Sequence, residues 1–165
     1  AEKLIRSISG IKVMEIEEKA GIPEVVDFLG MYDVHTIEEL HIKQRWEKNR
    51  IFESAKVLIG KKAGDEPFYL DIHERYHGPH GLLAGTTGSG KSEVLQTFIL
   101  SMAVNFSPEA VCFLLIDYKG AGLSALFSVL PHISGQLPNL PDGQAYRPTV
   151  SIKSENHRRL RILKA

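Results

Sequence analysis

The sequence predicts an α/β fold in which helices cover a mostly parallel sheet. Short apolar runs alternate with helical patterns through residues 81–165, which is typical of parallel strands joined by helical crossovers. One run, at 111–116, is apolar throughout, as expected for a central strand buried on both faces. A glycine-rich segment at 85–90 lies between an apolar run and an amphipathic pattern, so the predicted order there is strand, turn and helix.

Composition and charge narrow the class of protein. The chain has 165 residues, of which 43% are hydrophobic and 24% charged, and a single cysteine, so it is ordinary for a globular domain and is no disulfide scaffold. No apolar run approaches the ~20 residues of a membrane span. Residues 1–80 carry 12 basic and 15 acidic side chains and residues 81–165 carry 8 and 5. The formal charges of −3 and +3 cancel, which disfavours duplex DNA as the main partner.

The first 50 residues predict a small helical lead-in to the domain formed by residues 51–165. Apolar residues at helical spacing indicate a helix at 1–8. Pro23, a residue favoured in the first helical turn, indicates another at 23–29. The chain starts with neither an initiator Met nor a signal-peptide pattern, so we expect a piece of a larger protein.

Thr36 and Glu39 form a capping-box pattern, which predicts a third helix from there to Lys48. Trp46 is an isolated aromatic residue near the end of this helix. We expect it to pack on the following domain rather than to stack on a nucleic-acid base.

The domain at 51–165 begins with a predicted β-hairpin, in which β-rich runs at 56–60 and 67–72 flank turn chemistry at Gly64-Asp65. The remaining predicted elements are a loop at 77–80, a brief buried strand at 81–84, a helix at 90–105, a turn at 107–109, the strand at 111–116, a helix at 123–130, a Pro/Gly-rich connection at 134–143 and a final helix at 145–163.

One motif carries the chemistry. Gly85-Thr86-Thr87-Gly88-Ser89-Gly90-Lys91-Ser92 fits the phosphate-binding pattern G-x-x-x-x-G-K-[ST] at every defined position. Its glycines permit a tight path whose backbone N–H groups surround a phosphate, and the helix beginning near Gly90 adds its positive dipole end. Lys91 is expected to reach the β- and γ-phosphates of ATP, and the Ser92 hydroxyl to ligate Mg²⁺. The sequence therefore predicts nucleotide binding at 85–92.

Hydrolysis requires an acidic residue for Mg²⁺ and a group that positions water. Asp117 ends the strand at 111–116 and is followed by Tyr118, not by Glu. Asp117 is thus a candidate catalytic residue near Mg²⁺, or else a strand-end residue that caps the next turn. Lys119-Gly120-Ala121-Gly122 adds a second glycine-rich turn at this strand end, where open α/β sheets place ligands.

Other candidate residues have plainer explanations. His73, His77 and His80 lack companion ligands at metal spacing, so we expect loop packing and hydrogen bonding. Cys112, among apolar residues, is expected to be inert core. The final helix is basic, which fits contact with nucleic acid, phosphate or a neighbouring subunit, although solvated cations near a helix C-terminus are the simpler explanation.

The motif and its surroundings resemble the FtsK/SpoIIIE ATPase family and, within it, the type VII (ESX or Ess) secretion ATPases. The segments that carry the resemblance cover most of residues 23–163. They are His77-Gly78-Pro79-His80 and the run from there through the motif to Glu93, Phe113-Leu114-Leu115-Ile116-Asp117-Tyr118-Lys119-Gly120, Leu130-Pro131-His132-Ile133, Ser151-Ile152-Lys153-Ser154-Glu155, Phe28-Leu29-Gly30-Met31 and Arg45-Trp46.

The resemblance implies a RecA-like P-loop ATPase domain, one of several in tandem on the cytoplasmic face of the plasma membrane. Its partners would be neighbouring ATPase domains or subunits, as in the hexameric rings of the family, and its substrates small secreted helical-hairpin proteins. Membrane attachment would come through segments absent from this chain. In the family's pattern the catalytic Asp-Glu strand follows the final helix, so this chain would lack later core strands and hydrolyse little or no ATP alone.

Three functions remain open at this point. The first is an ATP-binding motor for type VII secretion. The second is a translocase of double-stranded DNA, as in the family's relatives. The third is a regulatory nucleotide-binding module that does not hydrolyse ATP.

Overall fold

The computed structural model describes residues 21, 25–117, 125–138 and 146–164. The α-helices are α2 (Phe28–Met31), α3 (Ile42–Lys48), α4 (Lys91–Asn105) and α6 (Tyr146–Leu163). The strands are β1 (Lys56–Lys61), β2 (Pro67–Asp71), β3 (Phe113–Asp117) and β4 (Ile133–Pro138), and the 3-10 helices are η1 (Glu38–Leu40) and η2 (Ala63–Asp65). The predicted helix at 1–8, the start of the one at 23–29 and the turn at 119–122 fall outside the described residues.

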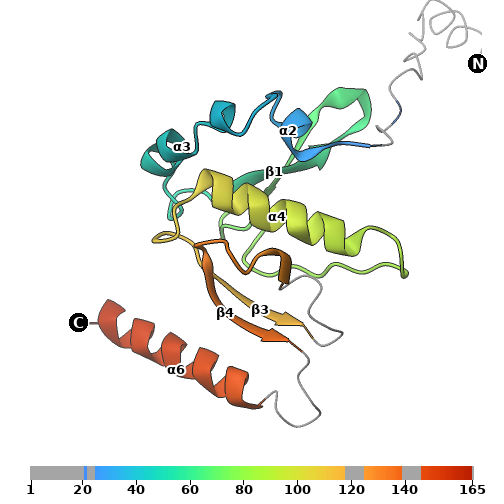
Figure 1. The fold of residues 1–165 in the computed structure, drawn as a ribbon. Helices are drawn as coiled ribbons and strands as arrows, with labels where there is room; N and C mark the ends of the chain where they lie inside the picture. Colours follow the sequence, from blue (N-terminus) through green and yellow to red (C-terminus); the bar gives the residue numbers. More distant parts are fainter. Residues whose placement is uncertain (1–20, 22–24, 118–124, 139–145, 165) are drawn as a thin grey trace, which may run out of the picture.

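Helix α4 is the central element, with the hairpin and the lead-in helices on one side and β3 and β4 on the other (Figure 1). Met102 packs against Val57 of β1 in one buried cluster. Ile99 packs against Leu115 of β3 in a second cluster. Because opposite sides of α4 are covered, its C-terminal half is apolar nearly all round, as a buried helix requires.

The predicted β-hairpin is confirmed: β1 and β2 pair antiparallel, with an irregularity between Leu58 and Gly60. Asp71 ends β2 and is buried. Its carboxylate accepts hydrogen bonds from the Ser54 hydroxyl at 2.6 Å and from the backbone N–H groups of Ala55 and His73 at 2.9 Å. Burial raises the pKa of Asp71, but these hydrogen bonds outweigh it, so the pKa lies below its ordinary value.

Strands β3 and β4 form a two-stranded parallel sheet, with Leu115 opposite Gln136 and Ile116 opposite Leu137. The predicted strand at 111–116 is present but begins two residues later, at Phe113. The prediction of a loop connection at 134–143 is wrong over its first half, because residues 133–138 form β4. Gly135, one reason for predicting a loop, has a packing role instead, since a Cβ there would lie 3.0 Å from the Leu114 side chain.

The lead-in is less helical than predicted. Residues 38–48 do not form one helix, because His41 has a left-handed backbone, with φ at 48°, that separates η1 from α3. The Glu39 carboxylate does reach back to a backbone N–H, but that of His35 rather than Thr36. The helix predicted at 23–29 begins only at Phe28, where Asp27 accepts the Gly30 N–H at 2.8 Å.

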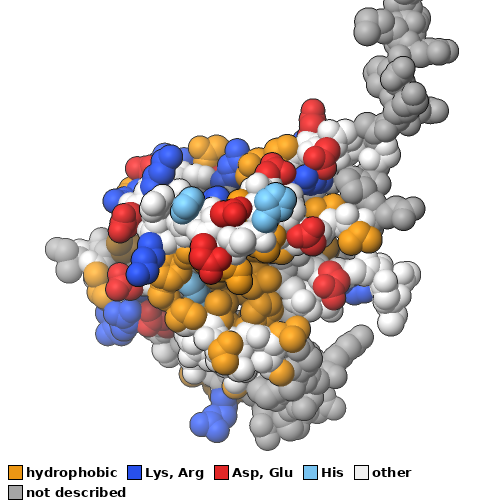
Figure 2. Space-filling view, turned by 45° about the horizontal axis from the view of Figure 1, so that its top comes forward, with side chains coloured by type: hydrophobic (Ala, Val, Ile, Leu, Met, Phe, Trp, Pro, Cys, Tyr) orange, Lys and Arg blue, Asp and Glu red, His pale blue; other side chains and the backbone are white. Residues whose placement is uncertain are grey.

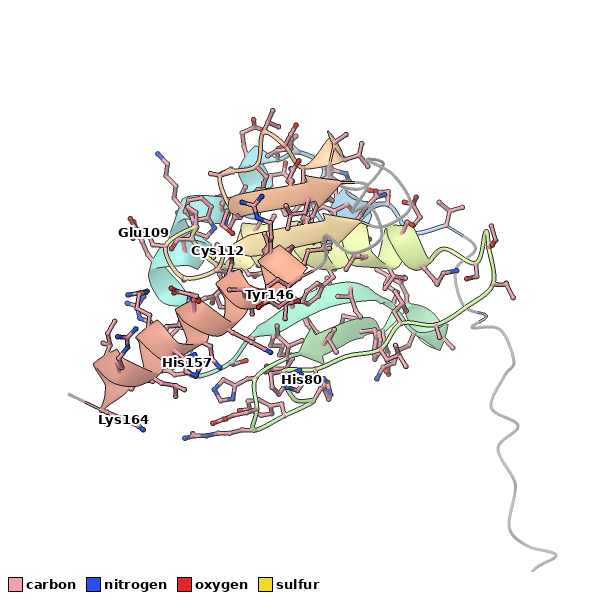
Figure 3. All side chains as sticks on the ribbon, turned by 90° about the horizontal axis from the view of Figure 1, so that it is seen from below. His80, Glu109, Cys112, Tyr146, His157 and Lys164 are labelled. Atoms are coloured by element: carbon pink, nitrogen blue, oxygen red, sulfur yellow. The ribbon has the colours of Figure 1, made fainter. Side chains whose placement is uncertain are left out.

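Two burial predictions are wrong. Residues 81–84 form neither a strand nor buried core: Leu82 is 94% exposed. An apolar run becomes a strand only where a partner pairs with it, and none of the described residues pairs with 81–84. Cys112, expected in the core, is exposed just before β3 (Figure 3).

Two of the remaining helices follow the predictions closely, and a third does so only in part. The helix predicted at 90–105 is α4, and the final helix predicted at 145–163 is α6. Of the helix predicted at 123–130, the described part is helical at 125–126 and a turn at 127–129. None of the helices in the described part of the chain combines the length and apolar character that crossing a bilayer requires.

Candidate nucleotide-binding site

The site begins with the backbone of the loop that precedes α4. Gly88 and Gly90 have φ angles of 80° and 84°, a left-handed conformation that residues with a Cβ rarely adopt. Gly85 is required for a different reason, because a Cβ there would lie 2.5 Å from the Ser89 hydroxyl. The three glycines of the motif therefore let residues 85–90 fold back tightly before the helix starts.

The loop runs directly into the N-terminus of α4. Gly90 is the N-cap residue and its carbonyl accepts the Val94 N–H at 3.0 Å, which starts the helix. The N–H groups of the first turn, at Lys91, Ser92 and Glu93, have no partners within an α-helix. Gly90 has no side chain to cap them. These donors and the helix dipole form a cradle suited to an anion.

The Lys91 side chain closes the loop. Its ammonium donates to the Gly85 carbonyl at 2.8 Å, to the Thr86 carbonyl, and to the Ser89 hydroxyl at 3.5 Å. The single cation of the motif thus lies over the same backbone turn that the first N–H groups of α4 border. Thr86, Thr87 and Ser89 are exposed on this loop, and so is Ser92 in the first helical turn.

For Asp117, the structure describes the position of the backbone alone. It is the last residue of β3, where its backbone pairs with Pro138 of β4. Nothing is described of its side chain, so the predicted approach of Asp117 to Ser92 and Mg²⁺ stays a prediction.

The histidines that precede the P-loop have hydrogen-bonding positions in the turn after β2. The His77 Nδ1 atom accepts the Asp71 N–H at 3.0 Å, and the His73 Nε2 atom lies 3.0 Å from the Phe52 carbonyl. His80 lies on the segment that leads from this turn toward α4 (Figure 3). Among the described residues, no group of three or more His, Cys, Asp and Glu side chains is arranged to hold a metal ion.

At the other end of α4, sequence patterns predicted the packing of Trp46 but not the contact made by His132. Trp46 packs on α4, which lies in the region predicted to form the following domain, and its indole N–H donates to the Ala103 carbonyl at 2.9 Å. His132 is buried and its Nε2 lies 2.8 Å from the Phe106 carbonyl. The one available signal was the Leu-Pro-His segment, which marks His132 without indicating its contact.

The fold and the loop define the class of protein: an α/β domain in which a glycine-rich loop with the phosphate-binding sequence pattern precedes the central helix. The chain belongs to the FtsK/SpoIIIE family, whose family model matches residues 36–145.

Within this family, the chain is similar to proteins of type VII secretion systems. It is 46% identical over 144 residues to the type VII secretion system protein EssC of Staphylococcus aureus (strain NCTC 8325 / PS 47), covering 87% of this chain and 10% of that protein. It is 49% identical over 143 residues to the ESX secretion system protein YukB of Bacillus subtilis (strain 168), covering 86% of this chain and 10% of that protein.

A solved structure has the same fold. The cytoplasmic domain of the Thermomonospora curvata type VII secretion ATPase EccC superposes with a TM-score of 0.71 and 32% sequence identity, covering 85% of this chain and 17% of that one. This chain therefore spans only about a tenth of the length of EssC and YukB.

Proposed function

We propose that this chain is the ATP-binding motor domain of a type VII secretion ATPase. The observation that carries the proposal is the loop at 85–90, closed by Lys91 and continued into the uncapped N-terminus of α4. Similarity to EssC, YukB and EccC over more than four fifths of the chain supports the choice of system. The lead-in at 1–50 and the ATPase domain at 51–165 are the two parts we propose for the chain.

The residues at the loop fit a nucleotide. The backbone N–H groups around Gly88, Ser89 and Gly90 and those of the first turn of α4 would hold the β-phosphate. In this structure the Lys91 ammonium donates hydrogen bonds to neutral backbone carbonyls. Charged phosphate oxygens are stronger hydrogen-bond acceptors for an ammonium group. The Lys91 ammonium would therefore exchange the loop carbonyls for the β- and γ-phosphates when ATP binds.

Mg²⁺ fits the same end of the helix, since the Ser92 hydroxyl is exposed one residue after Lys91. Held there by the Ser92 hydroxyl, Mg²⁺ would supply positive charge that offsets the negative charge of the phosphates. Asp117, at the end of β3, would act near Mg²⁺. Because Tyr118 rather than Glu follows Asp117, we propose that the residue that positions water comes from outside this chain.

The remaining parts of the proposal rest on the resemblance to the type VII secretion ATPases. The domain would work on the cytoplasmic face of the plasma membrane, next to further ATPase domains or subunits, and would drive export of small helical-hairpin proteins. The formal net charge of zero and the interspersed acidic and basic side chains in Figure 2 offer duplex DNA no extended basic surface there. This favours protein over DNA as the substrate.

The test is Lys91→Ala, followed by titration calorimetry with Mg-ATP. Removing the only side-chain cation of the motif should weaken binding by about tenfold or more, because a charge-assisted hydrogen bond to phosphate contributes about 1.5–3 kcal/mol. Lys164→Ala, at an exposed residue directly after the end of α6, is the control and should bind as the unchanged chain does. Equal affinities for the unchanged chain and Lys91→Ala would contradict the proposal.

Two further experimental outcomes would favour a different function for the chain. Strongly salt-dependent binding of duplex DNA by the full-length protein would favour a DNA translocase. ATP binding without turnover in the assembled protein would favour a regulatory module.

A further inference from the structure

The C-terminal end of α4 is held by side chains from outside the helix. Trp46 donates its indole N–H to the Ala103 carbonyl at 2.9 Å, and Asn49 donates its amide to the Asn105 carbonyl at 2.9 Å. His132 reaches the Phe106 carbonyl at 2.8 Å. Carbonyls at a helix C-terminus have no partners within the helix, so these contacts satisfy groups that would otherwise be buried unpaired. We call Trp46, Asn49 and His132 the α4 anchor.

The residues of the α4 anchor are closely packed against one another and against the rest of the chain. The rings of Trp46 and His132 meet edge to face, with centroids 5.6 Å apart, and His132 is only 1% exposed. Asn105, the last residue of α4, is also buried. The Asn105 side-chain oxygen accepts a hydrogen bond from the Arg45 guanidinium of α3 at 3.2 Å, and the Asn105 amide donates one to the Tyr32 hydroxyl at 3.0 Å. Parts of the chain far apart in sequence therefore converge on one helix end.

The two ends of α4 differ sharply in packing. Residues 101–106 are all buried, whereas residues 92–95 and the loop at 85–89 are exposed. A helix of 15 residues is a stiff rod of about 22 Å. Its position is therefore set at the buried end, while the exposed end carries Lys91 and the free N–H groups.

From this asymmetry we propose that Trp46, Asn49 and His132 are positioning residues for nucleotide binding, although none of them lies on the loop. The inference rests on the proposed function, because it concerns the same site. The α4 anchor fixes the axial position and rotation of α4, and hence the place of the Lys91 ammonium over the loop. Coupling of this kind is reciprocal: if the anchor strengthens nucleotide binding, bound nucleotide stabilises the anchor by the same factor.

The chain offers a direct reporter of the anchor, because Trp46 is its only tryptophan. In the nitrogen-15-labelled 165-residue chain, the single indole N–H signal reports the bond to the Ala103 carbonyl. Mg-ATP should shift this signal and slow exchange of its proton with solvent by about fivefold or more. Lys91→Ala should abolish both effects at the same nucleotide concentration. An indole signal unmoved while calorimetry shows saturated nucleotide would overturn the inference.

A substitution tests the opposite direction. Asn49→Asp keeps the size of the side chain but replaces the amide donor by an acceptor, so the Asn105 carbonyl loses its partner. We expect Mg-ATP affinity to fall about fivefold or more. Asn156→Asp makes the same change at an exposed site on α6 and should leave the affinity unchanged.

The outcomes separate the two proposals. If the unchanged chain binds no ATP, the proposed function fails and the inference fails with it. If the chain binds ATP and Asn49→Asp binds it equally well, the inference alone fails, even where the variant melts at a lower temperature. If Asn49→Asp does not fold, as judged by circular dichroism, the indole measurement on the unchanged chain decides.

Discussion

Single residues around the loop show why the motif has its composition. Gly88 and Gly90 have a left-handed backbone, and Gly85 leaves room for the Ser89 hydroxyl. Lys91 extends back across the turn to the Gly85 carbonyl. Each of these roles follows from a short stretch of chain, so each could be anticipated from the order of the residues alone.

Gly90→Ala should destabilise the chain by about 1–2 kcal/mol, because an L-residue in the left-handed region costs about that much. The substitution should also weaken Mg-ATP binding, since it strains the turn that orients the first N–H groups of α4. Urea unfolding followed by circular dichroism measures the first effect and calorimetry the second.

The matched control is Gly60→Ala in β1, where an added Cβ meets nothing within 4 Å and φ is not positive. There the free energy of unfolding should stay the same or rise slightly, because alanine restricts the unfolded chain more than glycine. Equal effects at the two sites would contradict the backbone argument.

At the scale of elements, α6 is stabilised by charge pairs on its own surface. The Glu155 carboxylate forms ion pairs with the Nε atoms of Arg158 at 2.7 Å and Arg159 at 2.8 Å, both about one turn further along the helix. Hydrogen bonds from these two arginines lower the pKa of Glu155 to about 2. All three side chains are exposed to a large extent, so added salt should weaken the pairs.

The lowered pKa of Glu155 makes the stability of α6 depend on pH. A carboxyl whose folded pKa is about 2 against an ordinary 4.5 stabilises the helix fully above pH 4.5, and its contribution is lost as pH falls from there to about 2. The helical Cα chemical shifts of residues 153–161 should therefore decrease over that range. Glu155→Gln should show less helix at pH 6 and no such decrease, while an unchanged profile would contradict the assignment.

At the scale of the whole molecule, α4 connects the proposed nucleotide site with the α4 anchor. One end borders the loop for nucleotide. The other end, at Asn105, is enclosed by α3, by Tyr32 and by His132 before β4. The two small sheets lie on different sides of this helix (Figure 1). Nucleotide binding at the loop would therefore be coupled through α4 to the lead-in.

The proposed division of labour predicts that ATP turnover needs more than this chain. The 165-residue chain should bind Mg-ATP but release phosphate about 100-fold or more slowly than the full-length protein, because a positioned general base contributes about that factor. Phosphate release measured per bound nucleotide tests this, with Lys91→Ala in the full-length protein as the inactive control. Equal turnover by the two proteins would show that the chain holds its own catalytic set.

The sequence by itself determined the loop, the helix that follows it and the hairpin, because their signals are local: glycines at fixed spacing, helical periodicity, and two β-rich runs around Gly64-Asp65. Only the tertiary structure decided that residues 133–138 are a strand, since pairing with β3 overrides a composition of Ser, Gly and Pro. It equally decided that Leu82 is exposed and that His41 breaks the lead-in helix. The α4 anchor belongs to this second group, because hydrogen bonds between residues more than 25 positions apart leave no trace in any local pattern.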